Sequence, residues 1–477
     1  MQFNSFAFLG FFAIVAAAYY LMPHRWRWLL LLGVSYYFYS SFSAPYLLLL
    51  ACATLVAWGF GRAVAAYPSR LVLAAGIVLQ LSVLVVLKYA DFLAGAAESA
   101  LGLAIPRDPP LALPRLDWLL PVGLSFYTFS CVSYLVDVRR GVIAAERHLG
   151  RLALYVAFFP KLIAGPIERA GPFLAQLDRP VRFDPALVAF GLQLFLWGLF
   201  KKVVIADRLA AFVDTAFATP AFQSPVNLTI AVYFYAFQIY CDFSGYSDMA
   251  IGAAAVLGIR LMENFRRPYL ARSVPEFWSR RWHISLMAWF RDYLYIPLGG
   301  SRVSRPRWYL NVMTVFAVSG LWHGAGLGFL VWGLLNGGYQ VVYLMTGRLR
   351  GWLAARLPGA LWNGLAIALT FHLVLLAWIF FRAESIGQAW VVITRLWGAL
   401  PMLPQLFATY SWPGAVLLSI GLILLLIAVE ILDEVGRFWE WLDRRHAVLR
   451  WGVSYALLAA LLVIGEWGMT RFVYMQF

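Results

Sequence analysis

The sequence predicts an all-α polytopic integral membrane protein that crosses the bilayer about 11 times. Of its 477 residues, 62% are hydrophobic and 13% are charged, whereas soluble proteins are only about 45–50% apolar. Long uncharged runs recur from end to end, and many approach the roughly 20 residues that a helix needs to cross a bilayer. No internal repeat or low-complexity tract divides the chain, so residues 1–477 are expected to form a single integral membrane domain.

The expected helices follow the apolar runs in order along the chain. These runs lie near 6–22, 27–42, 45–60, 71–93, 118–136, 149–165, 186–203, 227–258, 308–345, 361–381, 414–432 and 449–467. Two of them, 227–258 and 308–345, are each long enough to hold a pair of short helices. One or two of the other apolar runs are expected not to cross the whole bilayer.

Basic residues predict the orientation of the first helices. No basic residue precedes the first apolar run, while Arg25 and Arg27 follow it, which argues against a cleaved signal peptide and for a retained first helix. Under the positive-inside rule, segments 62–70 and 139–151 face the cytoplasm and 103–117 faces outward. The net charge of +15 is explained by these loops, so we expect the lipid bilayer, and not a nucleic acid, as the partner.

The middle third of the chain departs from this regular pattern. Segment 158–172, FFPKLIAGPIERAGP, carries three prolines and Lys161 beside an apolar run. Proline frees backbone groups that lipid cannot satisfy, so this stretch must be shielded by protein or line a cavity. Region 260–307 is too polar to span but contains apolar patches such as WHISLMAWF. It is therefore expected to be half-buried or re-entrant.

Four of the six histidines have surroundings that predict a solvated or structural role. His24, His148 and His446 each lie near arginine in loop-like sequence and are expected to be solvated. His372 stands alone in an apolar run, where a structural hydrogen bond to a neighbouring helix is expected.

His283 and His323 have unusual settings. His283 lies in the polar and aromatic segment EFWSRRWHISLMAWF, and His323 lies among glycines in SGLWHGAGLG. The glycines allow close approach either of a substrate or of another backbone. Burial would keep an imidazole neutral, the form that a general base needs. From these settings alone, a catalytic pair and a structural pair are both open.

Two acidic residues and three cysteines lie within apolar runs. Asp242 and Asp248 are expected to pair with an arginine such as Arg280, Arg281 or Arg291 and to fix helix packing. The alternative is an ion pathway in a transporter or flippase, with Lys161 and the histidines as further pathway residues. The cysteines lack metal-ligand spacing and are expected to be small buried hydrophobic residues: Cys52, Cys131 and Cys241. The sequence offers no motif for a bound metal or redox cofactor.

Several motifs, in this order along the chain, resemble those of the membrane-bound O-acyltransferase family. They are FFPKLIAGPIER at 158–169, YCDFSGYSDMAIG at 240–252, ENFRRPY at 263–269, EFWSRRWHISLMAWFRDYLYIPLGGSR at 276–302, SGLWHGAG at 319–326 and FVYMQF at 472–477. The likeness is greatest to the bacterial branch typified by the membrane subunit of alginate O-acetyltransferase. Met287 and Met475 depart from the family pattern, which leaves substrate detail open.

The resemblance implies a fold, a reaction and a site. The fold is a ring of membrane helices around a thin, partly re-entrant centre with a tunnel to the catalytic histidine, which corresponds to His323; the second family histidine corresponds to His283. The implied protein lies in a bacterial inner membrane and moves an acetyl group from acetyl-CoA or another acyl thioester toward an extracytoplasmic polysaccharide or periplasmic acetyl-handling proteins. The polymer, whether alginate, cellulose, peptidoglycan or another glycan, is open. Direct transfer and relay through an acyl-histidine are both open.

Overall fold

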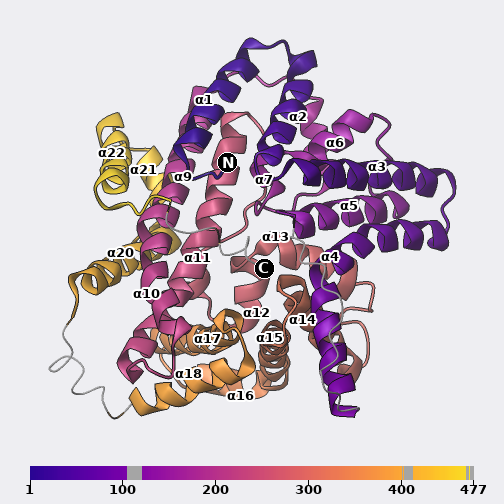
Figure 1. The fold of residues 1–477 in the computed structure, drawn as a ribbon. Coiled ribbons are helices and arrows are strands. Elements are labelled where there is room, and N and C mark those ends of the chain that lie inside the picture. The colour runs from indigo at the N-terminus through magenta and orange to yellow at the C-terminus, as the bar shows by residue number, and fades with distance from the viewer. Residues whose placement is uncertain (105–120, 400, 402–411, 469–471, 473–477) are drawn as a thin grey trace.

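The computed structural model describes residues 1–104, 121–399, 401, 412–468 and 472. Every regular element within these residues is a helix (Figure 1), which confirms the predicted all-α class. Most of the predicted outward segment 103–117 lies outside the described residues, as do residues 118–120 and Met475.

The first five helices follow the predicted apolar runs. They are α1 (Phe6–Leu21), α2 (His24–Ser40), α3 (Ala44–Ala66), α4 (Arg70–Ala104) and α5 (Leu124–Arg139). Pro23 separates α1 from α2, because proline is compatible with a helix start but not with a helix interior. Trp58 in α3 donates its indole N–H to the carbonyl of Arg147, 3.3 Å away. This contact joins α3 to the segment that follows α5.

The proline-containing middle segment forms short helices. These are α6 (Leu149–Ala157), α7 (Phe159–Leu162) and α8 (Ala170–Leu177). A full span over 149–165 is therefore wrong, because Pro160 begins a new helical turn and α6 is only 9 residues long. Residues 152–168 are all buried within the protein, which confirms that this irregular backbone is shielded from lipid.

Two long helical stretches pack closely against each other. They are α9 (Pro185–Phe200), continued by the π-helical turn η1 (Lys201–Ala206) and α10 (Asp207–Ala218), and α11 (Pro225–Val256). The expected pair of helices over 227–258 is wrong, since α11 is one helix of 32 residues. Its Gly245 is used for close packing, because a Cβ there would lie 2.7 Å from the carbonyl oxygen of Gly198 on α9.

The predicted half-buried region folds into short helical pieces. These are η2 (Pro268–Leu270), α12 (Val274–Glu276), η3 (Phe277–Arg281), α13 (Ile284–Phe290) and η4 (Arg291–Tyr295). Trp278 and Trp282 are almost completely buried, and Arg281 pairs with Glu276 at 2.7 Å and Glu434 at 2.8 Å. The expectation of a half-buried region is confirmed, since these tryptophans are buried whereas Arg280 and most of residues 301–307 are exposed.

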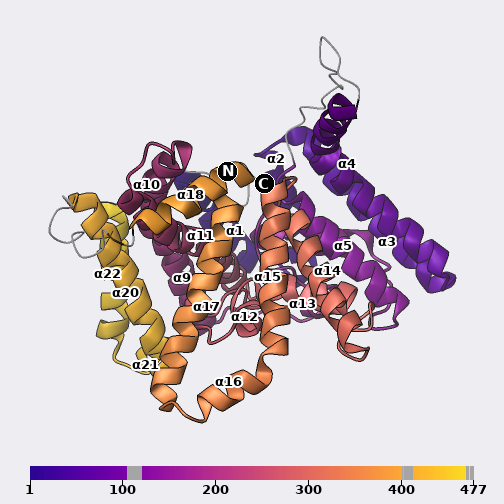
Figure 2. The ribbon, with the colours of Figure 1, turned by 90° about the horizontal axis from the view of Figure 1, so that it is seen from below.

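The last third is helical again, with several long helices and two short ones, α16 and α21. They are α14 (Arg305–His323), α15 (Leu327–Met345), α16 (Gly347–Ala354), α17 (Gly359–Arg382), α18 (Ile386–Ala399), α20 (Gly414–Gly436), α21 (Phe438–Asp443) and α22 (Ala447–Ile464). The predicted pair of helices over 308–345 is confirmed by α14 and α15. Figure 2 shows α15, α17 and α20 lengthwise, with α16 joining the first two at one end.

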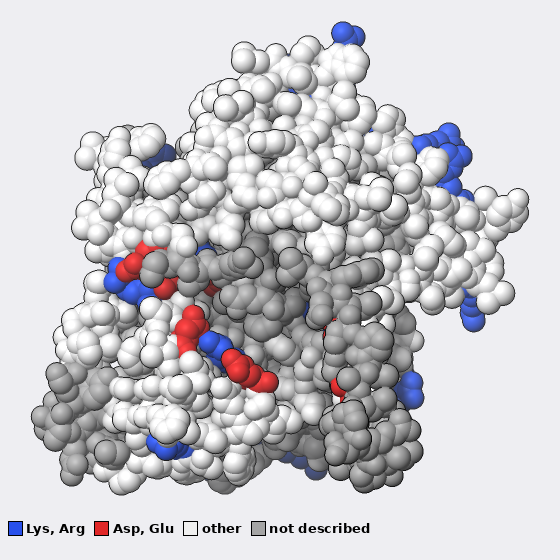
Figure 3. Space-filling view, viewed as in Figure 1, with Lys and Arg blue, Asp and Glu red and all other residues white. Residues whose placement is uncertain are grey.

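Six helices among the described residues are long and apolar enough to cross a membrane. They are Ala44–Ala66, Arg70–Glu98, Pro185–Ala218, Leu327–Met345, Gly359–Arg382 and Gly414–Gly436, and two shorter apolar helices are Phe6–Leu21 and Val448–Ile464. Many large apolar side chains on them face outward, among them Leu21 (86% exposed) and Leu71 (81% exposed). Figure 3 shows wide uncharged areas on one face, with acidic and basic side chains gathered near its middle and further basic side chains at its edges. Such continuous apolar surface is typical of a multi-pass membrane protein.

The three cysteines occupy two kinds of environment. Cys131 and Cys241 are buried, as predicted, but Cys52 is exposed. The expectation is wrong for Cys52 because it lies on an outward-facing side of α3, a helix apolar enough to contact lipid.

Candidate active site

His323 is the last residue of α14 and lies in an aromatic enclosure. Its side chain is almost fully buried, at 3% exposure of the residue. The imidazole centre lies 4.8 Å from the ring of Trp322, 4.9 Å from that of Trp332 and 5.3 Å from that of Phe381. These rings come from the end of α14, from α15 and from α17. Three separate helices therefore surround the imidazole with apolar surface that excludes water.

The glycines around His323 serve helix packing. A Cβ on Gly320 would collide with the backbone of Phe329, and a Cβ on Gly333 would collide with the backbone of Phe316. The two helices α14 and α15 therefore cross in direct backbone contact. A Cβ on Gly324 would likewise collide with the ring of Phe329. The sequence left open whether these glycines make room for a substrate or for another part of the backbone. In the described structure they make room for backbone atoms of the facing helix and for the ring of Phe329.

Lys88 on α4 holds the end of α14. Its ammonium donates to the carbonyl of Trp322 at 2.6 Å and to that of His323 at 3.1 Å. These carbonyls belong to the last turn of a helix, where intrahelical donors are lacking and a cation is favoured. The adjacent Tyr89 donates its hydroxyl to the carbonyl of Leu321. The sequence analysis missed Lys88, although a lysine inside a 29-residue apolar span was a signal.

His283 lies at the start of α13 in a left-handed backbone conformation, with φ of 45°. The residue is completely buried. Its Nδ1 lies 3.1 Å from the side-chain oxygen of Asn264. That same oxygen accepts from the backbone N–H of Ser285 at 3.2 Å and from its hydroxyl at 2.8 Å.

This arrangement assigns the tautomer of His283. A backbone N–H can only donate, so the Asn264 atom facing Ser285 must be the amide oxygen. The Nδ1 of His283 must then carry the hydrogen, and in the neutral ring Nε2 has the lone pair. Asn264 is itself held by a hydrogen bond to Ser247 on α11, 3.0 Å away. Asn264 lies within the ENFRRPY motif, but no role was predicted for it.

The fold brings His283 and His323 into one aromatic cluster. Trp322 links them, since its ring centre lies 4.8 Å from that of His323 and 6.1 Å from that of His283. Phe126 of α5 packs on the same group, 5.5 Å from Trp322 and 6.2 Å from His283. The two histidines are 40 residues apart in sequence, and only packing of α13 against α14 and α5 makes them neighbours.

Asp242 and Asp248 form ion pairs with lysines, so the predicted arginine partners are wrong. Asp242 lies 2.6 Å from the ammonium of Lys202, and Asp248 lies 2.7 Å from that of Lys201. Both lysines come from η1, which faces α11 across the close α9–α11 contact. Lys202 also pairs with Asp207 at 2.7 Å. The three arginines predicted as partners have other surroundings. Arg281 pairs with Glu276 and Glu434, and Arg291 pairs with Asp292. Arg280 is exposed.

These ion pairs favour the structural role of Asp242 and Asp248 over a transport pathway. Buried carboxylates that are matched by adjacent ammonium groups join α11 to the turn between α9 and α10. Lys161, the other proposed pathway residue, is buried with its ammonium 4.3 Å from the ring centre of Tyr155. His372 bonds to Tyr233 of α11 at 2.8 Å, which confirms its predicted hydrogen bond between helices. Within the part of the chain that the structure describes, no group of three or more metal-binding side chains is positioned to hold an ion.

The fold and the buried histidine pair define a multi-pass membrane protein whose candidate site lies in a dry aromatic enclosure. Residues 145–382 match the model of the membrane-bound O-acyltransferase family. The chain is 41% identical over 399 residues to the "Probable alginate O-acetylase AlgI" of Pseudomonas aeruginosa, which covers 81% of this chain and 72% of that protein.

Two further relatives extend this similarity. The AlgI protein of Azotobacter vinelandii is 37% identical over 444 residues, 91% of this chain and 84% of its own. The peptidoglycan O-acetyltransferase of Helicobacter pylori is 34% identical over 422 residues, 82% of this chain and 77% of its own. The chain therefore belongs to the membrane-bound O-acyltransferase family. It is a membrane O-acyltransferase, as the motifs predicted.

Proposed function

We propose that this enzyme O-acetylates an extracytoplasmic polysaccharide of the bacterial envelope, with alginate as the first candidate and peptidoglycan as the second. The names of its relatives support these acceptors, since three of them are a probable alginate O-acetylase, its counterpart in a second genus and a peptidoglycan O-acetyltransferase. The acyl donor is acetyl-CoA or another acyl thioester from the cytoplasm. The protein acts as one integral domain in the bacterial inner membrane, together with periplasmic acetyl-handling proteins.

The single observation that carries the proposed site is the burial of His323 among three aromatic rings beside His283. A thioester is already activated, so the reaction needs a base and the exclusion of water. A neutral nitrogen of His323 accepts the proton of an acceptor hydroxyl as the oxygen attacks the thioester carbonyl. The tetrahedral intermediate then collapses, the C–S bond breaks, and the imidazolium returns its proton to the leaving thiolate.

An acyl-histidine relay uses the same residue. A ring nitrogen of His323 attacks the thioester carbonyl, the C–S bond breaks, and the thiolate leaves with the ring proton as a free thiol. The acceptor hydroxyl then attacks the acyl-imidazole and transfers its proton to the ring. In both routes His283, whose ring is held by Asn264, positions the acyl donor. With its hydrogen on Nδ1, the neutral ring presents a lone pair at Nε2 and acts there as a hydrogen-bond acceptor.

The proposed membrane arrangement is a ring of about 11 crossings around a thin centre, with a tunnel that leads to His323. Shorter or more polar helices, such as α1, α5 and α22, supply the crossings beyond the six long apolar helices. The short pieces of region 260–307 form the thin centre beneath them.

The test compares His323→Ala with His372→Ala. General-base catalysis contributes about 10²–10⁴-fold, so His323→Ala should lose acetylation by at least about 10²-fold per folded molecule. His372 also lies in an apolar helix and makes a hydrogen bond between helices, so its variant controls for a general loss of stability. The measurement is the acetyl content of the polymer, normalised to folded membrane protein. Normal acetylation per folded His323→Ala molecule would refute the catalytic role.

A further inference from the structure

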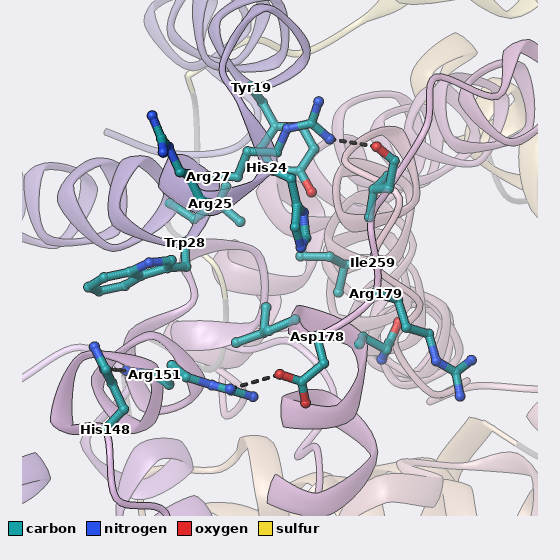
Figure 4. Close-up of a pocket in the computed structure, with 14 residues that line it drawn as sticks. Tyr19, His24, Arg25, Arg27, Trp28, His148, Arg151, Asp178, Arg179 and Ile259 are labelled. Atoms are coloured by element: carbon teal, nitrogen blue, oxygen red, sulfur yellow. Dashed lines mark hydrogen bonds and ion pairs between the residues drawn. The ribbon is translucent and has the colours of Figure 1, made fainter.

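Two cavities of the described structure differ in the chemistry of their walls. Figure 4 shows the first, where the start of α2 meets α6. There Asp178 pairs with Arg151 at 2.7 Å, and Arg27 donates to the carbonyl of Val181 at 2.6 Å, so these charges are engaged within the protein. The second cavity lies between α15, α16 and α17, and its lining is mainly apolar and aromatic. Its volume of about 540 Å³ is within the range of about 300–1,000 Å³ that is typical of ligand sites.

The second cavity occupies the space where α15 and α17 diverge. A Cβ on Gly328 would lie 2.8 Å from the carbonyl oxygen of Phe380, so the start of α15 touches the end of α17 directly. Figure 2 shows the two helices further apart at the opposite end, where α16 joins them. The lining begins at Tyr339 on α15 and continues through α16 to Leu373 on α17. The cavity is therefore a wedge between two helices, with α16 at its wide end.

This wedge lies beside the hydrocarbon of the bilayer. Both α15 and α17 are long and apolar enough to cross a membrane. Three of the lining residues, Val342, Leu365 and Leu369, are exposed on the surface of these helices, where lipid is their expected neighbour. Arg348 and Arg350 on α16 predict that the wide end faces the cytoplasm under the positive-inside rule.

The charged residues of the lining are mostly engaged within the protein. Glu276 pairs with Arg281 at 2.7 Å. Arg350 donates to the carbonyl of Tyr343 at 2.6 Å, and Arg272 is an exposed residue. Water fills a cavity only where polar groups can bind it, so the apolar walls determine what this cavity holds.

We infer that this cavity binds an acyl chain of a phospholipid from the cytoplasmic leaflet. Along α17 the lining changes from Trp362 and Asn363 near α16 to Leu369 and Leu373 further into the helix. This order matches a phospholipid, whose headgroup lies at the interface, where tryptophan is enriched, and whose chain points toward the bilayer centre. A flexible hydrocarbon chain follows an irregular apolar space and gains dispersion contacts with both helices.

The bound chain joins the two helices that enclose His323. Trp332 on α15 and Phe381 on α17 both pack on that imidazole. We expect the chain to stabilise the protein, because it fills the space between these helices and binds only their folded arrangement. The lipid site is separate from the histidine pair and does not rest on the proposed acyl transfer.

The test compares Ala366→Trp with Ala368→Trp. Ala366 lines the cavity, so an indole there occupies the space of the chain. Ala368 lies two residues further along α17, is exposed and is not part of the lining, so it is the matched control. Native mass spectrometry measures how much palmitoyl-oleoyl phosphatidylethanolamine each purified protein retains. The unfolding midpoint in detergent is measured with and without this lipid.

Ala366→Trp should retain on the order of tenfold less lipid than the wild type, because an overfilled site is costly to pack, while Ala368→Trp should retain the wild-type amount. Added lipid should raise the unfolding midpoint of the wild type and of Ala368→Trp, and raise that of Ala366→Trp much less. The inference is overturned if both variants retain as much lipid as the wild type. If Ala366→Trp instead loses a copurifying protein while its lipid retention is unchanged, a protein segment covers the cavity and the inference is wrong.

A second measurement uses the wild-type protein and does not depend on the folding of a variant. A phospholipid with a photoreactive diazirine in its acyl chain is incorporated into vesicles that contain the protein, and the labelled residues are identified by mass spectrometry. Labelling of the half-buried lining residues Tyr339 or Leu373 is expected. Labelling confined to outward residues such as Ala368 would show that lipid only surrounds the helices and does not enter the cavity.

Discussion

The ammonium of Lys88 lies 3.1 Å from the backbone carbonyl oxygen of His323 and donates a hydrogen bond to it. Lys88 lies within α4 and His323 ends α14, so one hydrogen bond connects two helices that are 235 residues apart in sequence. The same ammonium donates to the carbonyl of Trp322. This contact fixes the backbone that carries the proposed catalytic imidazole.

We expect Lys88→Met to impair both stability and acetylation. The substitution leaves two buried carbonyls without their donor, at a cost of about 1–3 kcal/mol each, and it frees the end of α14 to move. Activity per folded molecule should fall about tenfold or more, because small displacements of a catalytic group are costly. Polymer acetylation and detergent unfolding measure the two effects.

Two matched variants define this role. Lys88→Arg retains a cation and its donors, so it should recover part of the activity. Tyr89→Phe removes only the neighbouring hydrogen bond to Leu321 and should have a smaller effect. Wild-type acetylation by Lys88→Met would exclude a positioning role for Lys88.

Asn264 is predicted to position His283 through its side-chain oxygen. Asn264→Ala removes the acceptor of His283 Nδ1 and of the Ser285 N–H and hydroxyl, so the imidazole can rotate or change tautomer. Turnover per folded molecule should fall by about ten- to a hundredfold. Ser285→Ala is the control, because it removes one donor and leaves the contact with His283. Equal turnover of Asn264→Ala and the wild type would show that this contact does not matter for the reaction.

The Lys201–Asp248 pair is predicted to stabilise the fold. Lys201→Met leaves a carboxylate without its partner at 2.7 Å, and breaking a buried pair costs about 3–5 kcal/mol. The double variant Lys201→Met/Asp248→Leu removes both charges and should recover most of that loss, as measured by unfolding in detergent. A Lys201→Met protein that is fully stable but cannot acetylate would instead indicate a functional site.

The predicted topology is tested by single cysteines in a variant without Cys52, Cys131 and Cys241. Ala65→Cys and Ala144→Cys should react with a membrane-impermeant reagent only after the membrane is opened, because both follow the positive-inside pattern. Pro110→Cys, in the segment predicted to face outward, should react in intact cells. Labelling of position 144 in intact cells would reverse the proposed orientation.

The sequence by itself determined the all-α class and most of the helices, and it singled out His283 and His323 as candidate site residues. Its apolar runs predicted long helices such as α3, α17 and α20 because hydrophobic length is a local property. It also predicted that 158–172 would be shielded by protein, because its prolines free backbone groups whose hydrogen bonds lipid cannot supply. The motifs around His283 and His323 were sufficient to indicate the family.

Tertiary structure alone decided which groups meet. The lysine partners of Asp242 and Asp248 could not be predicted from spacing, because any buried cation satisfies a carboxylate and only the close packing of α9 on α11 selects Lys201 and Lys202. Likewise Lys88 reaches the end of α14 only because α4 lies beside it. Local sequence determines which segments form helices, while contacts between distant segments depend on helix packing, which sets the positions of side chains in three dimensions.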